Sequence, residues 1–176
     1  MKKLFILIAV ALPLYGLAQQ KAAIDSTKVM WLSLEQAETL CKTNPKKILI
    51  DAYTDWCGWC KKMDKETFQH PEIAKYLNKY FYPVKFNAET KDTITFLGSK
   101  YINFGSRTHP LALSLLGWRP SYPTIVYMTE RFEYLGPIPG YKNAMQMETI
   151  LHFIAEEKYK FTSLEEFEKN YKGKIQ

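Results

Sequence analysis

Two cysteines three residues apart stand where a strand pattern gives way to a helical one. Residues 46–52 contain the short, continuous apolar run that is typical of a strand covered on both faces. Residues 57–68 then have the pattern of a helix. This junction places Cys57 and Cys60 on one face of a helix start, close enough to form a disulfide as well as to act as a dithiol. The pattern indicates a redox site.

The first cysteine, Cys57, is expected to be the more reactive of the two. At the helix start it lies among N–H groups that have no partner within the helix, at the positive end of the helix dipole. Both features stabilise a thiolate and lower the pKa of the thiol. We therefore predict that Cys57 is the nucleophile and Cys60 the resolving thiol.

An acidic residue, Asp51, interrupts the apolar strand before the cysteines. The apolar neighbours favour burial, and burial without a partner raises the pKa of a carboxyl group. The alternative is a carboxylate at the strand end that faces solvent.

The chain begins with the three parts of a secretory signal, over residues 1–18. Lys2 and Lys3 supply positive charge, an apolar stretch follows, and small residues precede a cleavage site after Ala18. The stretch is short for a membrane span, although an uncleaved anchor is an alternative. We predict an exported, periplasmic protein whose single domain covers residues 19–176.

The composition argues against several other classes of protein. The formal net charge is +6, but the lysines are scattered, so the sequence does not predict a nucleic-acid partner. The three histidines occur singly, without the spacing of metal ligands. The third cysteine, Cys41, lies on the apolar side of a predicted helix and is interpreted as a buried thiol, with an intermolecular disulfide or a regulatory thiol as the alternative.

The remaining pattern predicts helices and strands in a mixed order. A strand, the cysteine helix and a second strand form a right-handed crossover with a parallel pair. The predicted strands cover 46–52, 81–87, 124–128 and 132–135, and the predicted helices cover 33–43, 57–68, 72–79, 93–102 and 108–117, with two more capped by Asn143 and Ser163.

This order, with its motifs, resembles the thioredoxin-fold superfamily over residues 33–158. Ile48 to Lys61 matches the family's strand, buried acid, tryptophan and Cys-x-x-Cys, Val84 to Asn87 matches the next strand, and Tyr122-Pro123-Thr124 matches the cis-proline loop. Residues 65–73 are most similar to the C-terminal domain of the thiol:disulfide interchange protein DsbD and to related exported proteins. The resemblance implies an α/β thioredoxin fold, a central mixed β-sheet flanked by helices.

The resemblance also implies roles for residues far apart in the sequence. Asp51 would handle the proton of Cys60, and Lys85 would be the partner of Asp51. A carboxyl group with a raised pKa is suited to proton exchange near neutral pH.

Substrate contacts are implied at two further places. Pro123 would be cis and would present its backbone beside Cys57, where an extended chain can pair edge-on. Tyr122 would face the sulfurs. Trp56, Gly58 and Trp59 would flank the site, and an exposed aromatic there offers apolar contact to a polypeptide. Core packing is the alternative for both tryptophans.

The sequence departs from thioredoxin in three ways. The dipeptide between the cysteines is Gly58-Trp59 rather than Gly-Pro, and these residues tune the redox potential. Residues 92–118 indicate an insertion before the cis-proline loop, which we interpret as a partner-selecting segment. Residues 159–176 add a helical extension after the core.

The predicted function is dithiol–disulfide exchange that reduces exported proteins, with no cofactor beyond the Cys57–Cys60 pair. Reduction in an oxidising compartment requires an electron donor, such as a membrane transporter of the DsbD type. A disulfide oxidase or isomerase is the alternative within the same chemistry. A non-catalytic binding module, whose cysteines hold a metal or a structural disulfide, is the alternative of a different class.

Overall fold

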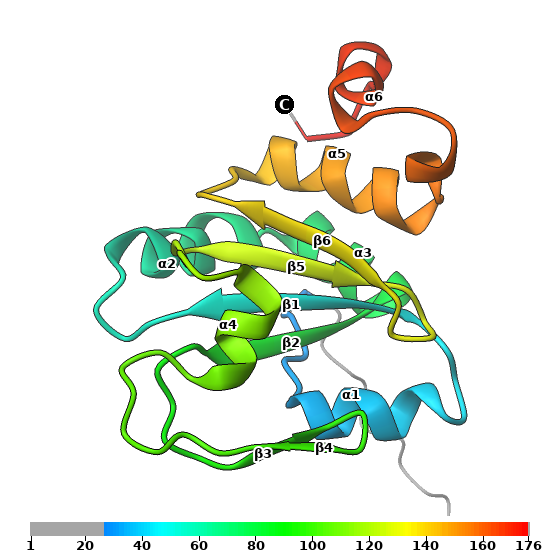
Figure 1. Ribbon diagram of the computed structural model, residues 1–176. Helices are drawn as coiled ribbons and strands as arrows, with labels where there is room; N and C mark the ends of the chain where they lie inside the picture. Colours follow the sequence, from blue (N-terminus) through cyan, green and yellow to red (C-terminus); the bar gives the residue numbers. More distant parts are fainter. Residues whose placement is uncertain (1–26, 176) are drawn as a thin grey trace, which may run out of the picture.

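A four-stranded mixed sheet forms the centre of the computed structural model, which describes residues 27–175 (Figure 1). The predicted signal over residues 1–18 lies outside the described residues. The strand order is β2-β1-β5-β6, with β1 and β2 parallel and the other pairs antiparallel. The strands are β1 (Lys47–Tyr53), β2 (Phe81–Asn87), β5 (Thr124–Met128) and β6 (Tyr134–Pro139).

Helices cover both faces of this sheet (Figure 1). The helical elements are α1 (Leu34–Cys41), α2 (Gly58–Met63), the π-helical turn η1 (Asp64–Phe68), α3 (Pro71–Tyr80), α4 (Pro110–Leu116), α5 (Ala144–Ala155), the 3-10 turn η2 (Lys158–Lys160) and α6 (Leu164–Asn170). None of the helices within residues 27–175 is both long enough and apolar enough to cross a membrane.

The side chains of β1 alternate between two hydrophobic clusters, as the period of a strand requires. Ile48 and Ile50 pack in the cluster that includes residues of α1 and α4. Leu49 packs in the other cluster, together with Met63 of α2 and Phe68 of η1. Asp51 follows Leu49 by two residues, so its carboxyl group points to the face that α2 and η1 cover.

Most of the predicted elements are present at the predicted places. β2 and β5 have the predicted bounds, and Asn143 caps α5 with its side chain accepting from the backbone N–H of Gln146. Ser163 accepts from the backbone N–H of Glu166 at the start of α6. The thioredoxin fold predicted from the sequence is confirmed.

The helix predicted over residues 93–102 is wrong. This segment forms a hairpin, β3 (Ile94–Phe96) and β4 (Ser99–Tyr101). Ile94 and Phe96 are buried while the residue between them is exposed, which is strand alternation. The two turn residues, Leu97 and Gly98, both have positive φ, as a two-residue hairpin turn demands.

Two further predictions needed smaller corrections. The partner of β5 begins at Tyr134 rather than at residue 132, because Phe132 has a positive φ and lies in the turn, where the Thr129 hydroxyl accepts from the N–H of Glu133. The cysteine helix is α-helical only as far as Met63 and continues as η1. The predicted burial of Cys41 is confirmed.

Candidate functional site

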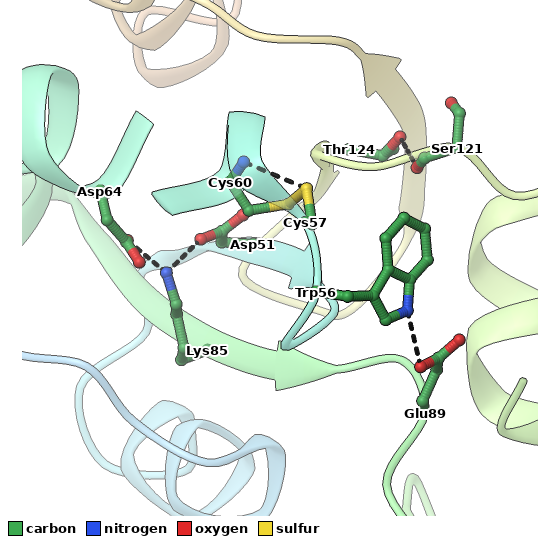
Figure 2. Close-up of a disulfide and its surroundings, with 9 residues drawn as sticks. All are labelled: Asp51, Trp56, Cys57, Cys60, Asp64, Lys85, Glu89, Ser121 and Thr124. Carbon is green, nitrogen blue, oxygen red and sulfur yellow. Dashed lines mark hydrogen bonds and ion pairs between the residues drawn. A yellow bond between two sulfur atoms is a disulfide. The ribbon is translucent and has the colours of Figure 1, made fainter. Parts of the chain in front are cut away.

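The site lies where β1 leads into α2, and its centre is a disulfide between Cys57 and Cys60 (Figure 2). Cys57 is the N-cap residue of α2, and its Sγ accepts a hydrogen bond of 3.1 Å from the backbone N–H of Cys60. Both cysteines are almost fully buried. The first cysteine therefore has the helix-start position that stabilises a thiolate.

A partly buried ion-pair group lies on the face of the sheet that α2 covers. Lys85 of β2 is the register partner of Asp51 of β1, and its Nζ donates to Asp51 Oδ2 at 2.6 Å. The same ammonium donates to Oδ1 of Asp64, the first residue of η1. Figure 2 shows Lys85 between the two carboxylates. One cation thus serves a carboxylate from the central strand and one from the cysteine helix.

The Asp51 side chain is 1% exposed, whereas that of Asp64 is 40% exposed. Burial raises the pKa of the Asp51 carboxyl to about 6, although the charge and hydrogen bond of Lys85 lower it, and the negative charge of Asp64 adds to the increase. Oδ1 of Asp51 is buried and has no hydrogen-bond partner within residues 27–175. Asp51 can therefore take up and release a proton near neutral pH.

Aromatic rings surround the Lys85 ammonium. Its Nζ lies 4.7 Å from the ring centroid of Trp31, 5.0 Å from that of Tyr53 and 5.7 Å from that of Phe68. Burial alone would lower the pKa of Lys85, but Asp51 and Asp64 outweigh it and raise the pKa above its ordinary value. Lys85 is therefore a charged partner for the ionised carboxylates of Asp51 and Asp64.

Trp56 stands at the edge of the site and is 59% exposed. Its indole Nε1 donates to Glu89 Oε2 at 2.9 Å, as drawn in Figure 2. The guanidinium of Arg107 lies over its ring at 5.2 Å, and Tyr122 packs edge-on against it with 6.1 Å between ring centroids. The alternative prediction for Trp56, packing in the core, is therefore wrong, because the side chain is exposed.

The loop before β5 brings Tyr122 and Pro123 to the same end of the sheet. The Tyr122–Pro123 peptide bond is cis, and Pro123 is buried. The hydroxyl of Thr124 donates to the carbonyl oxygen of Ser121 at 2.7 Å, which ties the loop to the start of β5. Thr124 is the register partner of Ala52, next to Asp51, so this loop borders the end of β1.

The dipeptide between the cysteines faces solvent. Gly58 is exposed, and a Cβ added to it would meet no atom within 4 Å. Trp59 is 59% exposed and lies 5.4 Å from the ring of Tyr141, with Lys62 near both rings. An aromatic surface thus lies on each side of the disulfide.

Three residues of the site were not predicted from the sequence. Asp64 follows Cys60 by four residues, so helix periodicity could have indicated it as a neighbour of the cysteine face. Glu89 and Arg107 carry no such signal, because only the fold brings them to Trp56.

Fold and disulfide together define a thioredoxin-like protein with an oxidoreductase fold. Residues 18–165 match the family model Thioredox_DsbH, described as "Protein of unknown function, DUF255". Since this match spans most of the chain, the protein belongs to that family.

Individual relatives are more distant. The thiol:disulfide interchange protein DsbD of Vibrio vulnificus is 38% identical over 47 residues, which are 27% of this chain and 8% of that protein. The chain spans about a tenth or less of the length of the curated relatives it matches. Among solved structures, a thioredoxin-fold protein from Helicobacter pylori has a TM-score of 0.59 at 19% identity, covering 84% of this chain and 93% of that one. A DsbH oxidoreductase has a TM-score of 0.55 at 18% identity, covering 80% and 92%. These structural likenesses establish the fold.

Proposed function

We propose that this protein is a periplasmic thiol:disulfide oxidoreductase that reduces disulfides in other exported proteins. The observation that supports it most is the Cys57–Cys60 disulfide at a helix start, on the sheet face that carries a buried carboxyl with a pKa of about 6. The secretory pattern of residues 1–18 supports export. The similarity to part of DsbD supports the chemistry of disulfide interchange.

The first step starts from the dithiol form. The thiolate of Cys57 attacks one sulfur of the substrate disulfide, so that bond breaks as a mixed disulfide forms. The second substrate sulfur leaves as a thiolate and takes a proton from water. The N–H of Cys60, which already donates to Cys57 Sγ, favours the thiolate before the attack.

The second step returns the protein to the disulfide form. Asp51 takes the proton of the Cys60 thiol, and the resulting thiolate attacks Sγ of Cys57. The mixed disulfide breaks, the substrate leaves fully reduced, and two electrons have moved from the protein to the substrate. The buried Oδ1 of Asp51 supports this role, because it is an acceptor that no group within residues 27–175 occupies.

The surroundings of the disulfide supply contacts for a polypeptide. The backbone of Tyr122, directly before the cis-proline, offers an edge for an extended chain, whereas the carbonyl oxygen of Pro123 already accepts from the N–H of Gly140 at 2.8 Å. Trp56 and Trp59 offer exposed apolar surface on the two sides of the sulfurs. The pair itself holds the electrons, so the reaction uses no cofactor. A membrane electron transporter of the DsbD type would reduce the disulfide after each turnover.

A trapping experiment tests the exchange chemistry. In a Cys60→Ala variant the mixed disulfide cannot be resolved, so partner proteins should stay attached through Cys57 on non-reducing gels of cell extracts. A Cys57→Ala, Cys60→Ala double variant is the matched control and should trap nothing. Equal trapping by both variants, or trapping by neither, contradicts the proposal.

A measurement of the redox potential tests the direction of electron flow. A value near that of thioredoxin, about −270 mV, supports a reductase, and a value near that of DsbA, about −120 mV, supports an oxidase instead. Metal analysis of the reduced, purified protein tests the binding-module alternative, because a structural zinc site would retain about one metal ion per chain.

A further inference from the structure

A small polar cluster joins the segment 92–118 to the active-site tryptophan. Arg107 lies in the loop between β4 and α4, and its Nε donates to Glu89 Oε1 at 2.8 Å. The other oxygen of Glu89 accepts from the indole of Trp56. Since the guanidinium also lies over the indole ring, Arg107 contacts Trp56 directly and through Glu89.

The loop that carries Arg107 is held on both sides by hydrogen bonds. Lys91 Nζ donates to the carbonyl oxygen of Ser106 at 2.7 Å, and Asn103 Nδ2 donates to the carbonyl oxygen of Thr90 at 3.0 Å. The N–H of His109 donates to the carbonyl oxygen of Ala88 at 2.8 Å, just after β2. These hydrogen bonds hold the loop on both sides of Arg107, and the contacts with Glu89 and Trp56 place its guanidinium.

The Arg107 side chain nevertheless remains 74% exposed. A guanidinium has five donors in a planar fork, and one of them, Nε–H, is used by Glu89. The terminal nitrogens are accessible beside Trp56, in the geometry that matches a carboxylate.

We propose that Arg107 is a positioning and specificity-determining residue for the exchange reaction at Cys57. It holds the Trp56 indole at the edge of the disulfide and binds a carboxylate of the incoming polypeptide. This inference rests on the proposed function and adds a substrate class to it. The favoured substrate has an Asp or Glu side chain close to its reactive cysteine.

The surface around Arg107 fits a polypeptide of this kind. Phe104 and Trp118 are almost fully exposed. Figure 1 places their loops, on either side of α4, at the end of the sheet where β1 leads into α2. Lys61, directly after Cys60, is exposed as well. An acidic side chain flanked by apolar ones would thus meet a cation next to aromatic rings.

The test uses the full protein and two peptides, each with one intramolecular disulfide. The peptides differ only in that two acidic residues beside the reactive cysteine are replaced by their amides. Reduction of each peptide is followed for the natural protein and for Arg107→Ala, Arg107→Lys and Arg131→Ala, with dithiothreitol as the reductant that restores the dithiol after each turnover and with its direct reaction with the peptide subtracted. Arg131 is an exposed arginine in the β5–β6 turn, at the other end of the sheet, so its variant controls for the loss of one charge.

We expect the natural protein to reduce the acidic peptide with a kcat/KM about threefold to fivefold above that for the amide peptide at low salt. The ratio should fall toward one at high salt, because the pair is exposed. In Arg107→Ala the acidic peptide should no longer be preferred, mainly because its KM increases. Arg131→Ala should keep the full preference for the acidic peptide, and Arg107→Lys should keep part of it.

Two results separate the inference from the proposed function. The same acid-to-amide ratio in the natural protein and in Arg107→Ala overturns the role of Arg107 and leaves the exchange reaction in place. A small neutral disulfide, 2-hydroxyethyl disulfide, reports on the exchange reaction without a carboxylate, and the natural protein and Arg131→Ala should reduce it at the same rate. If neither the natural protein nor any variant reduces the two peptides or 2-hydroxyethyl disulfide, both proposals fail.

Discussion

Two lysines, Lys47 at the start of β1 and Lys85 of β2 beside the other end of β1, each bridge two carboxylates. The two groups differ in how deeply those carboxylates are buried. At the start of β1, Lys47 pairs with Glu130 at 3.3 Å and with Glu157 at 2.8 Å. The side chains of Glu130 and Glu157 are 37% and 36% exposed. At the other end, Lys85 pairs with Asp64 and with Asp51, whose side chain is 1% exposed.

The difference in burial changes the sign of the pKa shift. Hydrogen bonds from Lys160 and Lys47 lower the pKa of Glu157 to about 2, and Glu130 is also held below its ordinary value, by its own backbone N–H and by Lys47. For Asp51, burial outweighs the same kind of cation and raises the pKa to about 6. A lysine partner alone therefore keeps a carboxylate ionised. A carboxyl group that exchanges protons near neutral pH must also be buried away from water.

The largest effect is expected for Lys85→Met. Methionine keeps the apolar stem in its aromatic surroundings but leaves Asp51 buried without a cation. We expect a loss of about 3 kcal/mol in the free energy of unfolding at about pH 8, measured by urea denaturation. The loss should be much smaller at about pH 4.5, where Asp51 is neutral in the folded protein.

The matched variant at the other end is Lys47→Met. Glu130 and Glu157 keep access to water, and Glu157 keeps its pair with Lys160. The destabilisation should therefore be smaller than for Lys85→Met and nearly constant between about pH 5 and 8. If the two variants lose the same free energy of unfolding with the same pH dependence, the contrast between the two lysines is wrong.

The second prediction concerns the stability of Asp51→Asn. Below the unfolded pKa of 3.8 the carboxyl group is neutral in both states, and between 3.8 and about 6 only the unfolded chain ionises. The free energy of unfolding of the natural protein therefore decreases as the pH rises from 3.8 to about 6, and it stays at the lower value above pH 6. At about pH 8 the variant should be more stable by up to about 3 kcal/mol, a gain that disappears near pH 4. A variant that is less stable at pH 8 contradicts the raised pKa.

The same substitution should have the opposite effect on activity. If Asp51 accepts the proton of Cys60, its loss should slow the resolving step about 100-fold at pH 7. In the natural protein the rate of the resolving step should increase as the pH rises through about 6, the pKa of Asp51. The variant should lack this increase. Stopped-flow release of a fluorescent peptide from the mixed disulfide measures the step. Glu130→Gln, at the other lysine, is the control and should leave the rate unchanged.

The central part of this site could be predicted because its signals are local in the sequence. The apolar run of β1, the acid within it and the cysteine spacing lie within residues 47–60. Strand alternation then decides which face Asp51 takes, and the parallel register brings Lys85 beside it. The order strand, helix, strand predicted the parallel pair. The resemblance to the thioredoxin-fold superfamily, rather than a local signal, predicted Lys85 as the partner of Asp51.

The rest depends on contacts that no local pattern encodes. The hairpin over residues 94–101 has only three residues in each strand, too few for a period to be read, and its turn requires a positive φ at Leu97. Arg107 reaches Trp56 because hydrogen bonds fix a loop that has no regular structure. Such residues become visible only when the tertiary fold is known.

The smallest effect is expected for Asp64→Asn, which sharpens the contrast at the Lys85 end. Asp64 competes for the Lys85 ammonium, and its negative charge raises the pKa of Asp51. Without that charge, Lys85 serves Asp51 alone, so the pKa of Asp51 should decrease and the acidic limb of the exchange rate should move to lower pH. The maximal rate should change little, because Asp51 itself remains. The pH–rate profile measures the shift, and a movement to higher pH would show that Asp64 acts on Asp51 mainly by holding Lys85 in place rather than through its charge.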